Sequence, residues 1–185
     1  MARANILVAG GTSTGKTTLT NALLAEVAKT TDRVVIIEDT RELQCAAPNL
    51  VSMRTKDGVA SLSDLVRSSL RLRPDRIPVG EVRGAEALAL LKAWNTGHPG
   101  GLATIHANNA AAGLVRLEQL IQEANVPPQP QLIAEAVDLL VSIVRTPHGR
   151  RIQEIVRVDG YSALGGYAVA PLVSNVVRLE PFIAA

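Results

Sequence analysis

The segment GGTSTGKTT, residues 10–18, combines glycines, a lysine and hydroxyl residues in a spacing that suits phosphate binding. It lies between the apolar run NILVA and the amphipathic stretch LTNALLAEVAK, so the sequence predicts a strand, a loop and a helix in that order. In this context G-x-x-x-x-G-K-T is the pattern of a P-loop, which binds the phosphates of a nucleotide. The predicted nucleotide-binding residues are Gly10, Gly11, Thr12, Ser13, Thr14, Gly15, Lys16, Thr17 and Thr18.

Each residue type in this loop has its own task. Gly10 and Gly15 lack side chains that would keep backbone N–H groups away from crowded phosphate oxygens. Lys16 is expected to lie between the β- and γ-phosphates, and Thr17 to give its hydroxyl to Mg²⁺. The following helix turns its partial positive end toward the anion. The loop therefore predicts ATP and Mg²⁺ as the cofactors.

A first group of carboxylates follows the predicted strand 33–38. The stretch IIEDTRE places Glu38, Asp39 and Glu42 there, at the edge where open α/β sheets bind their ligands. Acids at that edge can hold the water shell of a metal or orient an attacking water molecule. We predict Glu38 and Glu42 as catalytic residues and Asp39 as a magnesium residue. The alternative is a solvated helix cap, which fits Asp39 and Glu42 better than Glu38.

A second group follows the predicted strand 76–82. The stretch PVGEVRG places Glu81 and Arg83 at its end, and GLATIH places His106 at the end of the predicted strand 100–107. We predict all three as catalytic residues, with Glu81 also binding Mg²⁺ directly or through water and His106 near the γ-phosphate. The alternatives are an ordinary ion pair for Glu81 and a structural hydrogen bond for His106.

The composition points to helices packed on a parallel sheet. Of 185 residues 47% are hydrophobic but only 2% are aromatic, so Leu, Ile, Val and Ala must build the core.

Arginine supplies 15 of the 19 cationic residues, which favours contacts with phosphates or carboxylates. The net charge of +2 and the few aromatic residues argue against direct nucleic acid binding. The single Cys45 excludes a disulfide framework and fits the cytoplasm.

Strand-like and helical patterns alternate along the chain. No apolar run is long enough to predict a signal peptide or a membrane span. Two apolar runs flank TPHG and predict an antiparallel hairpin, whose HGRR segment (148–151) we interpret as a turn with solvated charge. The predicted strands are 5–9, 33–38, 50–54, 76–82, 100–107, 139–145 and 151–161, with 167–173 and 176–179 as weaker candidates, and the predicted helices are 16–29, 61–72, 84–97, 109–124 and 131–138.

The predicted fold class is α/β, with a mostly parallel sheet flanked by helices and an antiparallel C-terminal hairpin at the sheet edge. We predict one P-loop ATPase domain over residues 1–160. Residues 161–185 are a C-terminal extension of that domain or a tail.

The chain contains four blocks in this order: GGTSTGKTT, IIEDTREL, LRLRPDRIPVGEVRGAEALALLKAWNTGHPGG and GLATIHANN. Together they resemble the type II and type IV secretion ATPase superfamily, and within it the conjugal-transfer ATPases of the TrbB and VirB-type group. The resemblance implies a RecA-like P-loop NTPase fold. It also implies a Walker A loop at 10–18, an aspartate box at 38–42, a Walker B motif ending at Glu81 and a histidine box containing His106.

Members of that superfamily form hexameric rings on the cytoplasmic face of the bacterial inner membrane and use ATP hydrolysis to move secretion or pilus components. The resemblance thus implies a homo-hexamer, other subunits of the secretion or conjugation machinery as partners, and peripheral attachment to the membrane. Arg71 and Arg73 match arginines of the pattern. Ser13 stands where family loops usually have glycine. Family members also carry an amino-terminal domain that closes over the nucleotide, and its absence before the first strand predicts slow turnover.

Two other functions remain open at this point. The same loop occurs in phosphotransferases such as small-molecule kinases, although no lid or acceptor site can be identified. A nucleotide-gated assembly module with little turnover of its own is the second alternative. The pairing of VGEVRG with GLATIHAN favours the ATPase, because a small-molecule kinase does not need the second block.

Overall fold

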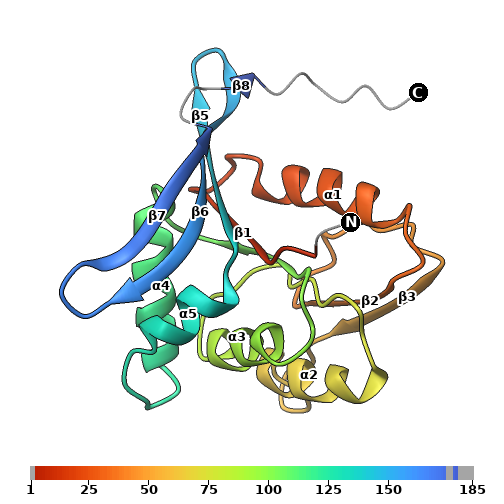
Figure 1. Ribbon diagram of the computed structural model, residues 1–185. Helices are drawn as coiled ribbons and strands as arrows, with labels where there is room; N and C mark the ends of the chain where they lie inside the picture. Colours follow the sequence, from red (N-terminus) through yellow and green to blue (C-terminus); the bar gives the residue numbers. More distant parts are fainter. Residues whose placement is uncertain (1–2, 174–176, 179–185) are drawn as a thin grey trace.

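The computed structural model describes residues 3–173 and 177–178, which form a sheet with helices on both faces (Figure 1). The elements in chain order are β1 (Ile6–Ala9), α1 (Lys16–Val27), β2 (Arg33–Glu38), β3 (Asn49–Arg54), α2 (Leu62–Ser69), the 3₁₀ turn η1 (Leu70–Leu72), α3 (Glu86–Asn95), β4 (Leu102–Ile105), α4 (Ala110–Gln122), α5 (Pro130–Ala136), β5 (Leu139–Thr146), β6 (Gly149–Ser162), β7 (Gly166–Val173) and β8 (Val177–Arg178).

Strand β1 lies in the middle of the sheet. It pairs in parallel with β4 on one side and with β5 on the other, and Ile6 is in register with both Leu102 and Leu139. Strand β6 runs antiparallel to β5 and also pairs with β7 and β8. The order β4-β1-β5-β6-β7 confirms the predicted α/β class and the antiparallel hairpin at the edge of the sheet.

The parallel pair β2 and β3 joins this sheet through residues 76–79. Our prediction of a strand over 76–82 is wrong in detail, because this segment forms only isolated bridges, from Val79 to Ile37 and to Ala103 and from Arg76 to Val34. Pro78 has no N–H to give to a ladder, which interrupts regular pairing. The carbonyl of Pro78 still accepts a hydrogen bond of 2.9 Å from the N–H of Ile37. The segment therefore places Glu81 beside the ends of β2 and β4.

Alternate strand residues supply two separate cores. Leu7, Val35 and Ile37 pack in the larger cluster with residues of α2, α3, α4 and α5. Val34 and Ile36 point the other way, toward Leu24 and Val27 of α1. Both faces of the central strands are thus buried, as the aliphatic composition requires for a parallel sheet covered by helices.

The C-terminal part of the described chain extends the edge of the sheet. The candidate strand 167–173 is confirmed as part of β7, and β8 lies within the candidate strand 176–179. Strand β6 runs without a break to Ser162, past the predicted domain boundary at residue 160. The rest of the predicted tail, residues 174–176 and 179–185, lies outside the described residues. Within the described part, no helix has the length and apolar character needed to cross a membrane.

Candidate active site

The P-loop connects β1 to α1 and packs against β5. Gly15 is the N-cap of α1 and has a left-handed backbone with φ of 99°, a conformation that favours glycine. No side chain caps this helix N-terminus. A Cβ on Gly10 would lie 2.5 Å from Thr14 Oγ1 and 2.7 Å from the carbonyl oxygen of Ile143. Gly15 is therefore required by its conformation and Gly10 by close contact.

Lys16 is held inside the loop. Its side chain is buried, and Nζ donates hydrogen bonds of 2.9 Å to the Gly10 carbonyl and 3.0 Å to the Gly11 carbonyl. Burial lowers the pKa of the Lys16 ammonium; the negative charges of Glu81 and Glu42 oppose this shift, and the positive charge of Arg83 adds to it. The ammonium thus lies at the centre of the loop with both acidic groups within electrostatic range.

The segment after β2 brings a second carboxylate to the P-loop. Glu42 Oε2 accepts a hydrogen bond of 3.0 Å from the Thr17 hydroxyl. Glu38 is buried, and its Oε2 accepts hydrogen bonds of 3.0 Å from the backbone N–H groups of Glu42 and Leu43. Glu38 therefore fixes the turn that presents Glu42, and its carboxylate does not face the loop lysine in this arrangement.

Arg83 joins the two predicted acidic groups. Its Nε donates a hydrogen bond of 2.6 Å to Glu81 Oε2, and its Nη1 lies 2.9 Å from Asp39 Oδ2. The hydrogen bond that Arg83 donates to Glu81 and the charges of Glu81 and Asp39 raise the pKa of Arg83 against the opposing effect of burial. The ordinary ion pair that we gave as the alternative for Glu81 is thus present, with Arg83 as the partner.

His106 approaches the same carboxylate from the end of β4. His106 Nε2 lies 2.7 Å from Glu81 Oε1, which is an ion pair when the imidazole is protonated. The alignment is not that of a hydrogen bond, and Glu81 Oε1 is a buried oxygen without a hydrogen-bond donor among the described residues. About half of the His106 side chain is exposed, at 49%, whereas Glu81 is only 12% exposed. A buried acceptor of this kind suits a water molecule or a ligand.

The residues predicted for Mg²⁺ do not all meet. Thr17 contacts Glu42, whereas Asp39 and Glu81 both contact Arg83. The free oxygen of Glu81 and the Thr17 hydroxyl are the hard oxygen groups that Mg²⁺ prefers, together with water and phosphate oxygens. These residues fit a magnesium ion that is held mainly by the nucleotide and by water. Asp39 fits less well, because its carboxylate already pairs with Arg83.

Other predicted loop residues have mainly structural contacts. The Thr14 hydroxyl donates a hydrogen bond of 2.9 Å to the Gly11 carbonyl, and Thr12 and Thr18 are exposed. Ser13 has a positive φ of 60°, which is the conformation for which family loops use glycine.

Sequence reasoning missed the contribution of the β5–β6 hairpin. A Cβ on Gly15 would lie 2.6 Å from Cδ of Arg150, so this side chain lies directly against the loop. Arg150 Nε also approaches the Ser13 carbonyl at 3.5 Å. Arg150 is exposed, as we expected for the HGRR segment, but it is not remote from the site. Only the pairing register of the hairpin could have revealed this contact.

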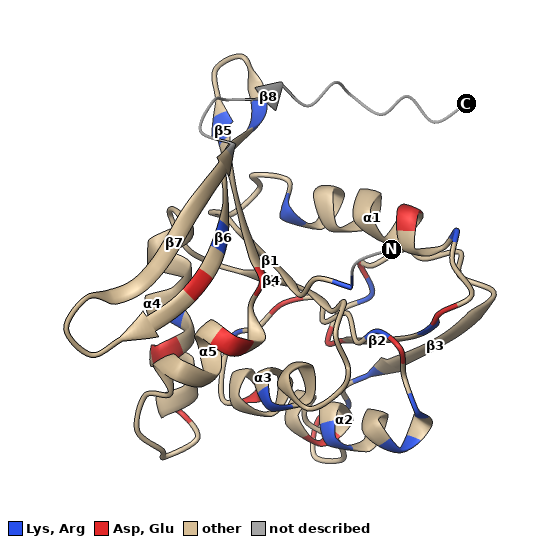
Figure 2. Ribbon diagram, viewed as in Figure 1, with Lys and Arg blue, Asp and Glu red and all other residues tan. Residues whose placement is uncertain are grey.

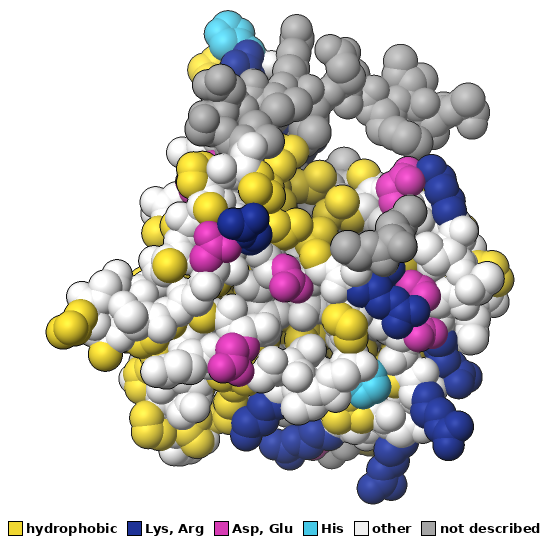
Figure 3. Space-filling view, viewed as in Figure 1, with side chains coloured by type: hydrophobic (Ala, Val, Ile, Leu, Met, Phe, Trp, Pro, Cys, Tyr) yellow, Lys and Arg dark blue, Asp and Glu magenta, His cyan; other side chains and the backbone are white. Residues whose placement is uncertain are grey.

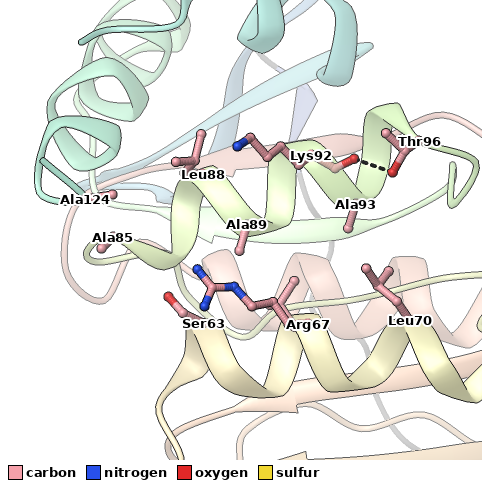
Figure 4. Close-up of a pocket in the computed structure, with 11 residues that line it drawn as sticks. Ser63, Arg67, Leu70, Ala85, Leu88, Ala89, Lys92, Ala93, Thr96 and Ala124 are labelled. Carbon is pink, nitrogen blue, oxygen red and sulfur yellow. Dashed lines mark hydrogen bonds between the residues drawn. The ribbon is translucent and has the colours of Figure 1, made fainter. Parts of the chain in front are cut away.

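A groove of about 470 Å³ lies apart from the P-loop, between α2 and α3 (Figure 4). Arg67 and Lys92 line it, beside apolar residues such as Leu70 and Leu88. Lys and Arg positions follow α2 and the turn after it (Figure 2), and basic side chains gather along the lower edge of the surface (Figure 3). Arg71, in η1, and Arg73, directly after it, are exposed.

The loop at the end of β1, the mostly parallel sheet and the acids at neighbouring strand ends define a P-loop nucleotide-binding domain of the α/β class. The chain belongs to the type II/IV secretion system protein family, whose model matches residues 1–169. This confirms the superfamily that the four sequence blocks resemble.

Three relatives illustrate the similarity. A probable conjugal transfer protein TrbB from Sinorhizobium fredii is 56% identical over 169 residues, which is 90% of this chain and 51% of that protein. The type IV secretion system protein VirB11 from Bartonella quintana is 38% identical over 82% of this chain and 45% of its own length. The crystal structure of the Brucella suis VirB11 ATPase in complex with sulphate has a TM-score of 0.76 and 31% identity, with 84% of this chain and 48% of that chain covered. The chain thus spans about half the length of these relatives.

Proposed function

We propose that this chain is the ATP-binding and ATP-hydrolysing motor domain of a conjugal transfer or type IV secretion ATPase. The observation that carries the proposal is the position of Glu81 Oε1, a buried oxygen without a hydrogen-bond donor among the described residues. It lies 2.7 Å from His106 Nε2, and the Glu81 charge acts on the Lys16 ammonium. The names of the relatives, a conjugal transfer protein and a VirB11 ATPase, support the same activity.

Lys16 and the start of α1 bind the phosphates. The ammonium of Lys16 exchanges its hydrogen bonds to the Gly10 and Gly11 carbonyls for bonds to phosphate oxygens. The N–H groups of the first turn of α1 have no side-chain cap and donate to the same anion.

Thr17 and Glu42 prepare the metal side of the site. Mg²⁺, when bound, neutralises charge on the β- and γ-phosphates and favours attack on the terminal phosphorus. The Thr17 hydroxyl, which donates to Glu42 in this structure, would hold the cation through its oxygen. Glu42 would then accept hydrogen bonds from the surrounding water.

Glu81 and His106 carry the hydrolytic chemistry. Glu81 Oε1 accepts a proton or a hydrogen bond from the attacking water and so holds this water in line with the terminal phosphorus. His106 donates to a γ-phosphate oxygen from the end of β4. Arg83 keeps Glu81 in place through Oε2 and leaves Oε1 free for water.

We extend the proposal to the assembly. The chain forms part of a homo-hexamer that works with other subunits of the secretion or conjugation machinery. This assembly acts in the cytoplasm, at the periphery of the cytoplasmic face of the bacterial inner membrane. The similarity to a conjugal transfer protein over 90% of the chain supports this setting.

Two substitutions test the proposed roles separately. Lys16→Ala is expected to weaken ATP binding at least about 100-fold, because a buried charge that meets the phosphates is lost. Glu81→Gln is expected to bind ATP normally and to lose at least about 100-fold in turnover, as expected for loss of a general base. Calorimetry measures the affinity and phosphate release measures the turnover.

Lys92→Ala and Glu26→Gln serve as matched controls, because both residues are exposed and lie on helices away from the Glu81 carboxylate. Unchanged ATP affinity in Lys16→Ala would contradict the phosphate site. Normal hydrolysis in Glu81→Gln would remove Glu81 from the mechanism. Tight ATP binding without hydrolysis by the unmodified chain would favour a nucleotide-gated assembly module, and transfer of phosphate to a small acceptor would favour a kinase.

A further inference from the structure

Arg150 lies in a position that the proposed hydrolysis does not use. It follows the turn between β5 and β6, and its aliphatic part packs on Gly15, where a Cβ would lie 2.6 Å from Cδ and 3.2 Å from Nε. Its Nε also approaches the Ser13 carbonyl at 3.5 Å. The structure records no acceptor for the terminal nitrogens of Arg150 among the described residues. The planar end of this side chain is therefore available beside the P-loop.

The register of the hairpin directs Arg150 to the loop. Arg145 pairs with Arg150 and Ile143 with Ile152, so these pairs share one face of the ladder. Ile143 on that face lies beside Gly15, at 3.6 Å from a Cβ placed there. A bulge in β6 shifts the register between Ser142 and Ile143. Without the extra residue, Arg151 would take the position of Arg150, because a one-residue shift exchanges the two faces.

The two flanks of β1 carry different chemistry. Glu81, Arg83 and His106 all belong to segments on the β4 side, where the terminal phosphate is cleaved in the proposed function. The β5–β6 hairpin lies on the opposite flank of β1 and rises beside the start of α1 (Figure 1). In the proposed function the terminal phosphate points to Glu81, so a nucleotide that runs across the P-loop would bring its nucleoside end toward the other flank. Arg150 is the cationic side chain that contacts the loop there.

Aromatic side chains of the described chain lie elsewhere. Trp94 is buried, and its Nε1 donates a hydrogen bond of 3.3 Å to the Ile77 carbonyl. Tyr161 and Tyr167 pack edge to face with each other between β6 and β7, with ring centroids 5.1 Å apart. A guanidinium is flat and weakly hydrated, and it stacks on π-systems as aromatic rings do. The described residues at the P-loop thus offer Arg150 as the planar partner for a base.

We propose that Arg150 binds the nucleoside end of the nucleotide by stacking its guanidinium on the purine base. This inference rests on the proposed function, since it needs the γ-phosphate at Glu81. Arg150 contributes equally to ATP and ADP affinity, because both carry the same base. It has no part in hydrolysis itself, so turnover at saturating ATP does not depend on it.

The test measures binding of ADP, of a non-hydrolysable ATP analogue and of inorganic tripolyphosphate by calorimetry. Arg150→Ala is expected to weaken both nucleotides about 3- to 30-fold, the range of a cation–π contact, and to leave tripolyphosphate unchanged. Arg150→Lys keeps the charge but loses the plane, so it is expected to recover little of the nucleotide affinity. In hydrolysis assays, KM rises by a similar factor while kcat stays within about twofold.

Arg157→Ala is the matched control, because Arg157 is an exposed arginine of the same strand that pairs with Leu139 at the far end of β5. Wild-type ADP affinity in Arg150→Ala overturns the inference and leaves the proposed function intact. An equal loss for tripolyphosphate also overturns it, because Arg150 would then be a phosphate ligand. An unmodified chain that binds none of the three overturns the proposed function and the inference together.

Discussion

Ser13 shows how a single backbone conformation shapes the P-loop. Its φ of 60° lies in the left-handed region, where a side chain other than glycine is strained. The loop nevertheless keeps the Gly10 and Lys16 geometry, since Lys16 Nζ reaches the Gly10 carbonyl at 2.9 Å. The departure from the family pattern at this position is therefore tolerated, at a cost in stability.

We expect Ser13→Gly to stabilise the chain by about 0.5–1 kcal/mol, because glycine adopts this conformation without steric strain. The midpoint of urea unfolding, with the slope of the transition checked for constancy, measures the change. Thr12→Gly is the control, since Thr12 is not among the described non-glycine residues with positive φ. There we expect a loss of about 0.5–1 kcal/mol from added flexibility. A less stable Ser13→Gly protein would argue against strain at this position.

At the residue scale, spacing predicted the identities of the site residues but not their partners. The P-loop glycines and Lys16 follow from a local motif in which neighbouring residues meet one ligand. The sequence could not predict that the Glu38 carboxylate accepts hydrogen bonds from the backbone of Glu42 and Leu43. Glu38 and Glu42 lie in one short segment, and nothing in its residue pattern distinguishes the role of one carboxylate from that of the other. Arg150 lies more than 130 residues from Ser13 in the sequence, so only tertiary structure brings the two together.

An ion-pair network joins elements at the end of the sheet opposite the P-loop. Asp32, directly before β2, binds Arg76 Nε at 2.6 Å and Arg3 Nη2 at 2.6 Å. Burial alone would raise the pKa of the Asp32 carboxyl. The hydrogen bonds and positive charges of Arg76 and Arg3 lower this pKa by more, so it stays below its usual value. The network attaches the segment before β1 and the segment after η1 to the start of β2.

The depressed pKa of Asp32 sets the sign of a pH effect. Its stabilising contribution is fully present above the unfolded pKa of about 3.9 and is lost as pH falls toward the folded value. We expect Asp32→Asn to lower the free energy of unfolding by about 3 kcal/mol at pH 6, since Arg76 stays buried without its partner. The difference from the unmodified protein should shrink at pH 3. Urea unfolding at both pH values measures it.

Asp57→Asn provides the control for this network, because Asp57 is exposed and no ion pair to it is recorded in the described residues. We expect a change of less than about 0.5 kcal/mol there, as is usual for surface substitutions. A pH-independent difference for Asp32→Asn would mean that Asp32 acts through packing and not through its charge.

At the element scale, periodicity located every described helix, and local chemistry explains the boundaries. The predicted helix 61–72 appears as α2 followed by a 3₁₀ turn, with a capping box between Ser61 and Asp64 at its start. The segment 76–82 has the apolar residues of a strand and was predicted as one. A prediction from apolar residues ignores that Pro78 has no N–H to donate, and the segment forms only isolated bridges. The bulge in β6 was also beyond prediction, because it depends on the partner strand.

For the whole molecule, the order of parallel strands brings distant blocks to one edge. The sequence predicted this edge, since strand ends in an α/β sheet collect the loops that bind ligands. The sequence did not predict the pairing of β5 with β1, which places the C-terminal hairpin against the nucleotide loop. The four sequence blocks end at residue 109, before this hairpin, although the family model extends over it to residue 169.

The proposed ring leads to a prediction for the assembled protein. If subunits complete each other's sites, the ATPase rate per subunit is expected to rise with protein concentration, by at least about threefold across the association range. Sedimentation under the same conditions shows whether association coincides with the rise. Lys16→Ala at each concentration gives the background. A constant rate per subunit while oligomers form would contradict shared sites and favour an ATPase or kinase that acts as a monomer.

The hydrogen bonds of Lys16 to two main-chain carbonyls have a kinetic consequence. A lysine that pointed into solvent would have to lose its rotamer freedom at each encounter with ATP. In the proposed function the phosphates of ATP meet this ammonium, so ATP binding replaces its neutral carbonyl acceptors by charged phosphate oxygens with little motion of the side chain. Association can then proceed close to the encounter rate, and differences in affinity between nucleotides will arise mainly from how fast each one leaves.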